Sequence, residues 1–373
     1  ALVAGTAVAL WQANEARREA ARASAVQAFL VDLFRANTVN QEDPVRARQT
    51  TARELLDRGA QRLGDSLADH PAAKEALAGV LERLYGELGL WAEASDVGEQ
   101  RLAEARRLYD ARDPRLTNAI LDLLSSLVGR DPTPRDRTLP LIAEARAQID
   151  ARGETTTLAR ARLEYLAGVA DDEMPSDATI ASARTAAAIF REHHPAHPDR
   201  VDALRLLAVS LNRVGAWNEA RNAALEALTV AREQRLPPYV LVSLMRVAGE
   251  IRSMLDEVDE ADALLAEAYR LSERVNGPRH PGTLAVRRVL FTHYAWTGRA
   301  AEADALAEGF LDDLRSPDAG REAAQLQDTR RELFYLRFSR GRIGDAERIV
   351  NDALADYGSG IPATFEAADL LRG

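Results

Sequence analysis

Cysteine is absent from this sequence of 373 residues, and aromatic residues make up only 5% of it. Without a thiol, the chain forms no disulfide bond, offers no thiol nucleophile and provides no thiolate ligand for a metal ion. No run of alternating β-branched residues is long enough to predict a β-sheet. Alanine, leucine, arginine and glutamate are abundant instead, and this bias favours helices. The composition therefore predicts an all-α protein.

A basic surface is also lacking, because acidic residues outnumber basic ones and the formal net charge is −10 at pH 7. General binding to nucleic acid requires a basic surface. We therefore expect no nucleic-acid partner. The net charge itself favours solubility of the folded chain.

The first eleven residues are apolar and uncharged, and they end at Trp11. A complete membrane span needs about 20 such residues, and tryptophan is frequent at the membrane interface. We therefore predict that residues 1–11 are the C-terminal part of a transmembrane helix. A signal-peptide core is the alternative, but no small-residue cleavage site follows. We further predict that residues 12–36 form a juxtamembrane stalk helix and that residues 37–69 form a linker with a leading helix.

A helical hairpin recurs about every 42 residues from position 70 onward, and residues 280–303 show it most clearly. Pro281 opens a helix, where its missing N–H costs nothing. Gly298 ends that helix, and Glu302 opens the next one. Such a hairpin buries its apolar face only against copies of itself. We therefore predict a solenoid over residues 70–357 and a capping tail over residues 358–373.

Three markers keep this period, namely the opening prolines, the hairpin glycines and an acidic residue followed by alanine. Together they define about seven hairpins: 70–110, 113–151, 156–192, 198–234, 238–275, 281–315 and 322–356.

These hairpins resemble tetratricopeptide repeats. The segments LERLYGELGLWAEA (81–94), LAVSLNRVGAWNEA (207–220) and LFTHYAWTGRAAEA (290–303) carry the resemblance. The period and the proline openers are similar to the longer repeats of kinesin light chains. Glu82 and Phe291 depart from the pattern, since the family prefers a small residue there. The resemblance implies a right-handed superhelical solenoid whose first helices line a concave groove.

The N-terminal part, residues 1 to about 65, resembles that of bacterial membrane-anchored serine/threonine protein kinases. This resemblance implies a sensor module beyond a single span in the inner membrane, with the solenoid in the periplasm and a dimer formed through the stalk. Arg17, Arg18 and Arg22 favour the cytoplasmic side instead. The chain lacks a glycine-rich loop with its lysine, an HRD-like loop and a DFG motif. ATP and Mg²⁺ are therefore expected only for a kinase domain outside this chain, which itself needs no cofactor.

Four arginines occupy the same position in successive first helices: Arg205, Arg246, Arg288 and Arg331. The tetratricopeptide resemblance places this position in the groove, where a guanidinium group binds a carboxylate of a partner bidentately. Asn212, Arg213 and Ser243 are assigned to the same surface. The alternative is that each arginine pairs with an acid of its own or the next repeat, such as Asp202 or Glu250. The earlier repeats lack the arginine column.

Other candidate sites have simpler explanations. The histidines at positions 193, 194 and 197 suggest a Zn²⁺ or Ni²⁺ site, but His197 matches the residue that opens other repeats. The acidic runs at 171–173 and 256–260 lack the spacing of a calcium loop and predict turns. We expect no metal. Trp91 and Trp217 are predicted to lie in the core, whereas Trp296 is the aromatic candidate for a contact surface.

The sequence shows no converging nucleophile, base and oxyanion donor. These observations therefore predict a non-catalytic module that binds a peptide or protein. The ligand expected from the arginine column is acidic. The kinase resemblance makes the chain the sensor of a transmembrane kinase. A constitutive assembly scaffold at the cell envelope and the sensor half of a membrane-anchored transcriptional regulator are the alternatives.

Overall fold

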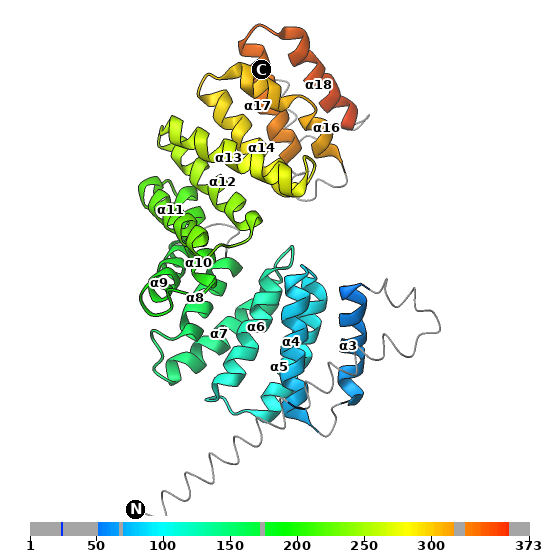
Figure 1. Cartoon of the computed structure of the whole chain (residues 1–373), viewed down its shortest axis with the longest axis vertical. Helices are drawn as coiled ribbons and strands as arrows, with labels where there is room; N and C mark the ends of the chain where they lie inside the picture. Colours follow the sequence, from blue (N-terminus) through cyan, green and yellow to red (C-terminus); the bar gives the residue numbers. More distant parts are fainter. Residues whose placement is uncertain (1–23, 25–50, 67–69, 172–175, 317–324, 358–373) are drawn as a thin grey trace, which may run out of the picture. The chain divides into compact units, whose positions relative to one another are not determined.

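The structure is a computed structural model that describes residue 24 and residues 51–66, 70–171, 176–316 and 325–357. Every regular element in these ranges is helical (Figure 1), which confirms the predicted fold class. None of the described helices is both long and apolar enough to cross a membrane. The predicted span, the stalk helix apart from residue 24, and the capping tail lie outside the described residues.

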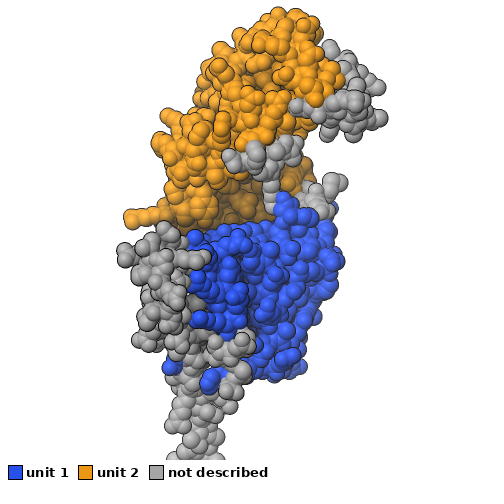
Figure 2. Space-filling view, turned by 90° about the vertical axis from the view of Figure 1, so that its right-hand side faces the viewer, with its two compact units in different colours: residues 1–195 blue, residues 196–373 orange. Residues whose placement is uncertain are grey.

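The chain forms two compact units, residues 1–195 and 196–373, which are coloured separately in Figure 2. The regular repeat pattern in the sequence does not mark this division.

Unit 1 begins with one leading helix and continues with three hairpins. The leading helix is α3 (Ala52–Ser66), and the hairpins pair α4 (Pro71–Glu87) with α5 (Trp91–Leu108), α6 (Pro114–Val128) with α7 (Arg135–Ala151), and α8 (Leu158–Ala170) with α9 (Asp177–His193). Pro71 and Pro114 are the first residues of their helices, as the sequence predicted. Leucines such as Leu77 and Leu124 are fully buried between neighbouring helices.

Unit 2 contains the remaining four hairpins. They pair α10 (Asp199–Arg213) with α11 (Trp217–Glu233), α12 (Pro238–Met254) with α13 (Val258–Asn276), α14 (Pro281–Trp296) with α15 (Ala300–Ala307) and α16 (Phe310–Arg315), and α17 (Leu326–Ser339) with α18 (Ile343–Tyr357). The second helix of the third pair is interrupted at Gly309, which has a φ of 68°. A residue with positive φ breaks the helical hydrogen-bond pattern.

The hairpin turns are left-handed at their glycines. Gly89, Gly215, Gly298 and Gly341 have φ values of 72°, 78°, 77° and 71°. Glycine adopts this conformation easily because it has no Cβ, whereas the Cβ of other residues is crowded there. In the α12–α13 hairpin the same position is occupied by Asp256, with a φ of 60°. This explains why the fifth hairpin lacks the glycine marker although its turn is kept.

Candidate functional site

The four column arginines lie on the first helices of unit 2. These helices, α10, α12, α14 and α17, pack against one another in this order, and each carries one arginine of the column. We call the surface that these arginines share the first-helix face. It is built within a single compact unit.

Three of the four arginines pair with an acid on their own helix. The distances between nitrogen and oxygen are 3.6 Å for Arg205 and Asp202, 3.3 Å for Arg246 and Glu250, and 2.7 Å for Arg331 and Asp328. Each pair is partly exposed, so it contributes only about 0–1 kcal/mol to stability. The sequence had offered such pairing as the alternative to ligand binding. These three guanidinium groups are therefore already engaged within the chain.

Arg288 differs from the other three. It forms no ion pair with any residue that the structure describes, and its Nε atom is buried without a hydrogen-bond partner. A buried donor without an acceptor costs about 1–3 kcal/mol relative to a satisfied one. Arg288 is thus the member of the column with unused capacity to bind.

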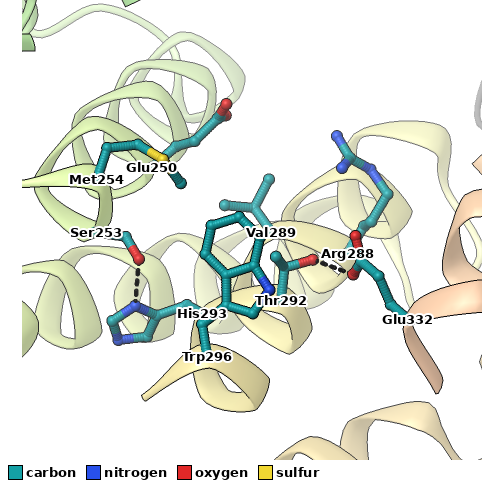
Figure 3. Close-up of a pocket in the computed structure, with 9 residues that line it drawn as sticks. All are labelled: Glu250, Ser253, Met254, Arg288, Val289, Thr292, His293, Trp296 and Glu332. Carbon is teal, nitrogen blue, oxygen red and sulfur yellow. Dashed lines mark hydrogen bonds between the residues drawn. The ribbon is translucent and has the colours of Figure 1, made fainter. Parts of the chain in front are cut away.

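Arg288 lines a pocket formed by three of the first helices (Figure 3). The cavity volume is about 180 Å³. The lining residues come from α12 (Glu250, Ser253 and Met254), α14 (Arg288, Val289, Thr292, His293 and Trp296) and α17 (Glu332). Trp296 is 64% exposed. The aromatic residue that the sequence assigned to a contact surface is therefore next to the unpaired arginine.

The polar residues of the pocket wall are held by bonds between helices. The Thr292 hydroxyl donates to the Glu332 carboxylate over 2.6 Å and connects α14 to α17. Ser253 Oγ lies 2.9 Å from Nδ1 of His293 and connects α12 to α14. His293 is 1% exposed, and its Nε2 atom has no hydrogen-bond partner. Burial lowers the pKa of His293, so the imidazole is neutral at pH 7.

The other residues assigned to this surface do not line the pocket. Asn212 is nearest, since its side-chain amide donates to Glu250 over 3.4 Å. Ser243 is half-buried near the start of α12, and Arg213 is exposed at the end of α10. The sequence missed Glu250, His293 and Glu332 as pocket residues, because the helix period places them on a helix face but does not show which faces enclose a cavity.

The structure corrects the prediction that Trp217 is a core residue. Trp217 is the first residue of α11 and is 39% exposed. Trp91 is half-buried, and its ring lies against Gly129: a Cβ on that glycine would be 2.4 Å from Trp91 Cδ2. The same sequence position thus has two different environments.

Unit 1 places a different arginine at the column position. A Cβ on Gly79, the column position of α4, would lie 2.7 Å from Cζ of Arg101. The Arg101 guanidinium, which comes from α5, therefore occupies the space that a side chain of α4 would fill. It pairs with Glu75, Glu82 and Asp122 at 2.8, 3.1 and 2.7 Å. A glycine in the middle of a helix, here Gly79, was the feature of the sequence that indicated a side chain packed closely against α4.

The Glu82 carboxyl is the most perturbed group in this cluster. It is 3% exposed, and burial raises its pKa to about 7 although Arg101 opposes the change. The Ser126 hydroxyl donates to it over 3.3 Å. Asp122 differs, since Arg162 and Arg101 outweigh its burial and hold its pKa below the usual range. Glu82 departs from the repeat pattern in the sequence because it belongs to this cluster.

The remaining candidates take part in helix ends and turns. Nε2 of His194 lies 3.1 Å from the Thr156 carbonyl, and Nδ1 of His197 accepts the Asp199 backbone N–H over 3.2 Å. Asp171 accepts the Ser176 hydroxyl over 2.9 Å at the start of α9. Within the described residues no three side chains form a cluster suited to a metal ion.

Comparison with known proteins identifies the fold. No family model matches the chain, and no curated protein matches it in sequence. Among solved structures, a signal transduction ATPase with a tetratricopeptide repeat sensor from Pyrococcus horikoshii is 15% identical, with a TM-score of 0.57, and the match covers 86% of this chain and 50% of that one.

Two further structures match almost the whole chain. A Rap protein complexed with Competence and Sporulation Factor is 14% identical, with a TM-score of 0.55 and coverage of 94% of this chain and 95% of that one. NprR in complex with its cognate peptide NprX is 13% identical, with a TM-score of 0.50 and coverage of 93% and 96%. These likenesses establish a helical-repeat fold of the tetratricopeptide type.

Proposed function

We propose that this chain is a non-catalytic module that binds a peptide or protein on the first-helix face of unit 2. The observation that carries the proposal is the pocket between α12, α14 and α17, where an arginine that forms no ion pair with any described residue lies beside an exposed tryptophan. Arginine and tryptophan are enriched among the residues that contribute most to protein interfaces. Two of the structures with this fold were solved with a bound factor or peptide, which supports the same class of ligand.

The module belongs, in this proposal, to a bacterial transmembrane serine/threonine protein kinase. The support is the resemblance of residues 1 to about 65 to such kinases. The catalytic domain, with its ATP and Mg²⁺, would lie outside this chain. Residues 1–11 would anchor the chain in the inner membrane with the repeats in the periplasm, and the stalk helix would form a dimer that transmits occupancy of the binding face.

Selection from a random nonapeptide library displayed on phage, with the full chain as the target, tests the binding function. We expect enrichment of a small set of sequences whose synthetic peptides bind saturably. The control is a variant in which Arg205, Arg246, Arg288 and Arg331 are changed to alanine. Loss of binding by this variant, with unchanged helicity, supports the first-helix face as the site. Equal binding by both chains places the site elsewhere.

Protease treatment of intact spheroplasts tests the proposed topology. Digestion of the repeats from outside is the expected result. Protection of the repeats until the cells are lysed would place them in the cytoplasm, as the three arginines after the predicted span suggest.

A further inference from the structure

We infer that the pocket between α12, α14 and α17 is an anchor site for one uncharged, apolar side chain of an extended peptide, whose backbone amide is bound between Arg288 and Glu332. The inference rests on the proposed function and specifies the chemistry of its ligand. It differs from the sequence-based expectation of an acidic ligand that contacts the whole arginine column.

The size and walls of the cavity fit a single apolar side chain. A cavity of about 150 Å³ with apolar walls holds one benzene molecule, and this one has about 180 Å³. In Figure 3 the Trp296 indole lies at the centre of the site, with Met254 on one side and Arg288 and Glu332 on the other. An indole face and a thioether pack well against aromatic or aliphatic groups. The exposed indole is therefore the surface on which the ligand side chain rests.

The charges of the pocket favour a neutral ligand. Arg288 contributes one positive charge and Glu332 one negative charge, while the charge of Glu250 is matched by Arg246 at 3.3 Å. Arg288 would attract a carboxylate on the ligand, but Glu332 would repel it. A ligand without net charge meets no such conflict.

A peptide amide supplies both hydrogen-bonding groups that Arg288 and Glu332 need. The guanidinium group only donates and the carboxylate only accepts, whereas a peptide unit offers one C=O acceptor and one N–H donor. Arg288 forms no ion pair with any described residue and its Nε is buried without an acceptor, so the terminal nitrogens of its guanidinium group are the donors left for a ligand carbonyl. Glu332 already accepts the Thr292 hydroxyl, and its carboxylate has further lone pairs for an N–H group.

His293 supports the same assignment. Its ring lines the pocket, and its Nε2 atom is buried and has no partner. Because burial lowers the pKa of His293, the ring adds no charge to the site. A neutral ring in the pocket wall adds no preference for an anion.

The peptides enriched from the nonapeptide library provide the test. A fluorescein-labelled peptide is titrated with the full chain, and its anisotropy is recorded for Trp296→Ala, Arg288→Met and Glu332→Gln. The control for Trp296→Ala is Trp217→Ala, because Trp217 is also exposed but lies outside the pocket. The control for Arg288→Met is Arg270→Met, which removes an exposed arginine of α13, a second helix outside the first-helix face.

We expect the enriched peptides to share one apolar residue and no acidic residue. Trp296→Ala should weaken binding about 30-fold, as for a central aromatic residue. Arg288→Met and Glu332→Gln should each weaken it about 3- to 10-fold, as for one hydrogen bond. Both control variants should bind within about twofold of the original chain, and added salt should change the affinity of the peptide little.

Three results would overturn the inference. Enriched peptides with a shared acidic residue, bound less tightly in high salt, would make the pocket a carboxylate site. Peptides that bind all three pocket variants normally would place the anchor elsewhere and leave the proposed function standing. Failure to enrich any peptide would refute the proposed function together with the inference.

Discussion

Replacement of Glu82 by glutamine should make the protein more stable at alkaline pH and leave its stability at acidic pH unchanged. Glu82 lies between α4 and α6 with 3% of its surface exposed, 3.1 Å from the Arg101 guanidinium. Arg101 is shared with Glu75 and Asp122, so Glu82 has only part of the charge of this cation. Glutamine has nearly the same shape as a protonated glutamic acid and carries no charge at any pH.

The sign of the effect follows from the pKa of Glu82, which is raised from 4.5 to about 7 by burial. Between these two pH values the folded state holds a proton that the unfolded state has released. The contribution of Glu82 to stability is therefore complete below pH 4.5 and is lost as the pH rises to 7. At about 1.4 kcal/mol for each pH unit, the loss is on the order of 3 kcal/mol. The variant avoids this loss.

Urea unfolding at pH 5, 6, 7 and 8 measures the difference. Fluorescence of Trp91, measured with the other three tryptophans changed to phenylalanine, follows unit 1, and circular dichroism follows the helices of both units. We expect equal free energies of unfolding at pH 5 and an advantage for the variant that grows to about 2–3 kcal/mol at pH 8. Glu87→Gln, an exposed change on the same helix, is the control and should show no such trend. A variant that is destabilised equally at pH 5 and pH 8 would show that Glu82 is ionised throughout and would refute the reasoning.

Four further substitutions test other interactions. Arg101→Met leaves buried carboxylates without their cation. It should lower the free energy of unfolding in urea by about 3–5 kcal/mol at pH 8 and by less at pH 5. An equal decrease at both pH values would contradict the pairing of Arg101 with these carboxylates. Gly129→Ala brings a methyl group to 2.4 Å from the Trp91 ring, so it should lower the free energy of unfolding by about 1–3 kcal/mol. Gly344→Ala is its counterpart, because the added methyl group meets nothing within 4 Å. This substitution should raise the free energy of unfolding by up to about 1 kcal/mol. Asp256→Gly removes the steric strain of a side chain in the left-handed conformation. It should raise the free energy of unfolding by about 1 kcal/mol and the melting temperature with it. An unchanged melting temperature would mean that aspartate is unstrained there.

The hairpins could be predicted from the sequence because their signals are local. A proline that opens a helix and a glycine with positive φ that ends one each act through the backbone of a few neighbouring residues. Pro281 and Gly298 therefore marked α14 correctly. The fifth turn has no glycine because Asp256 takes the same left-handed conformation. An aspartate in the sequence does not by itself indicate a left-handed turn.

The partners of the column arginines could be predicted only in part. Acids three or four residues away on the same helix are visible in the sequence, and Arg205, Arg246 and Arg331 pair with them. The sequence did not single out Arg288 as the arginine without such a partner, nor Trp296 as its neighbour in a cavity. The cavity depends on how α12, α14 and α17 pack, which the spacing of residues along one helix does not determine.

The helices, their pairing into hairpins and the positions of the arginine column could be derived from the sequence, since these follow from residue spacing and backbone preference. Tertiary structure alone decided which arginine remains unpaired, that Arg101 from α5 fills the space beside Gly79, and that Glu82 is buried deeply enough to hold a proton near neutral pH. The physical reason is that charge pairing and burial depend on distances between helices. Those distances are set by side-chain packing across the repeats and not by the order of residues within one of them.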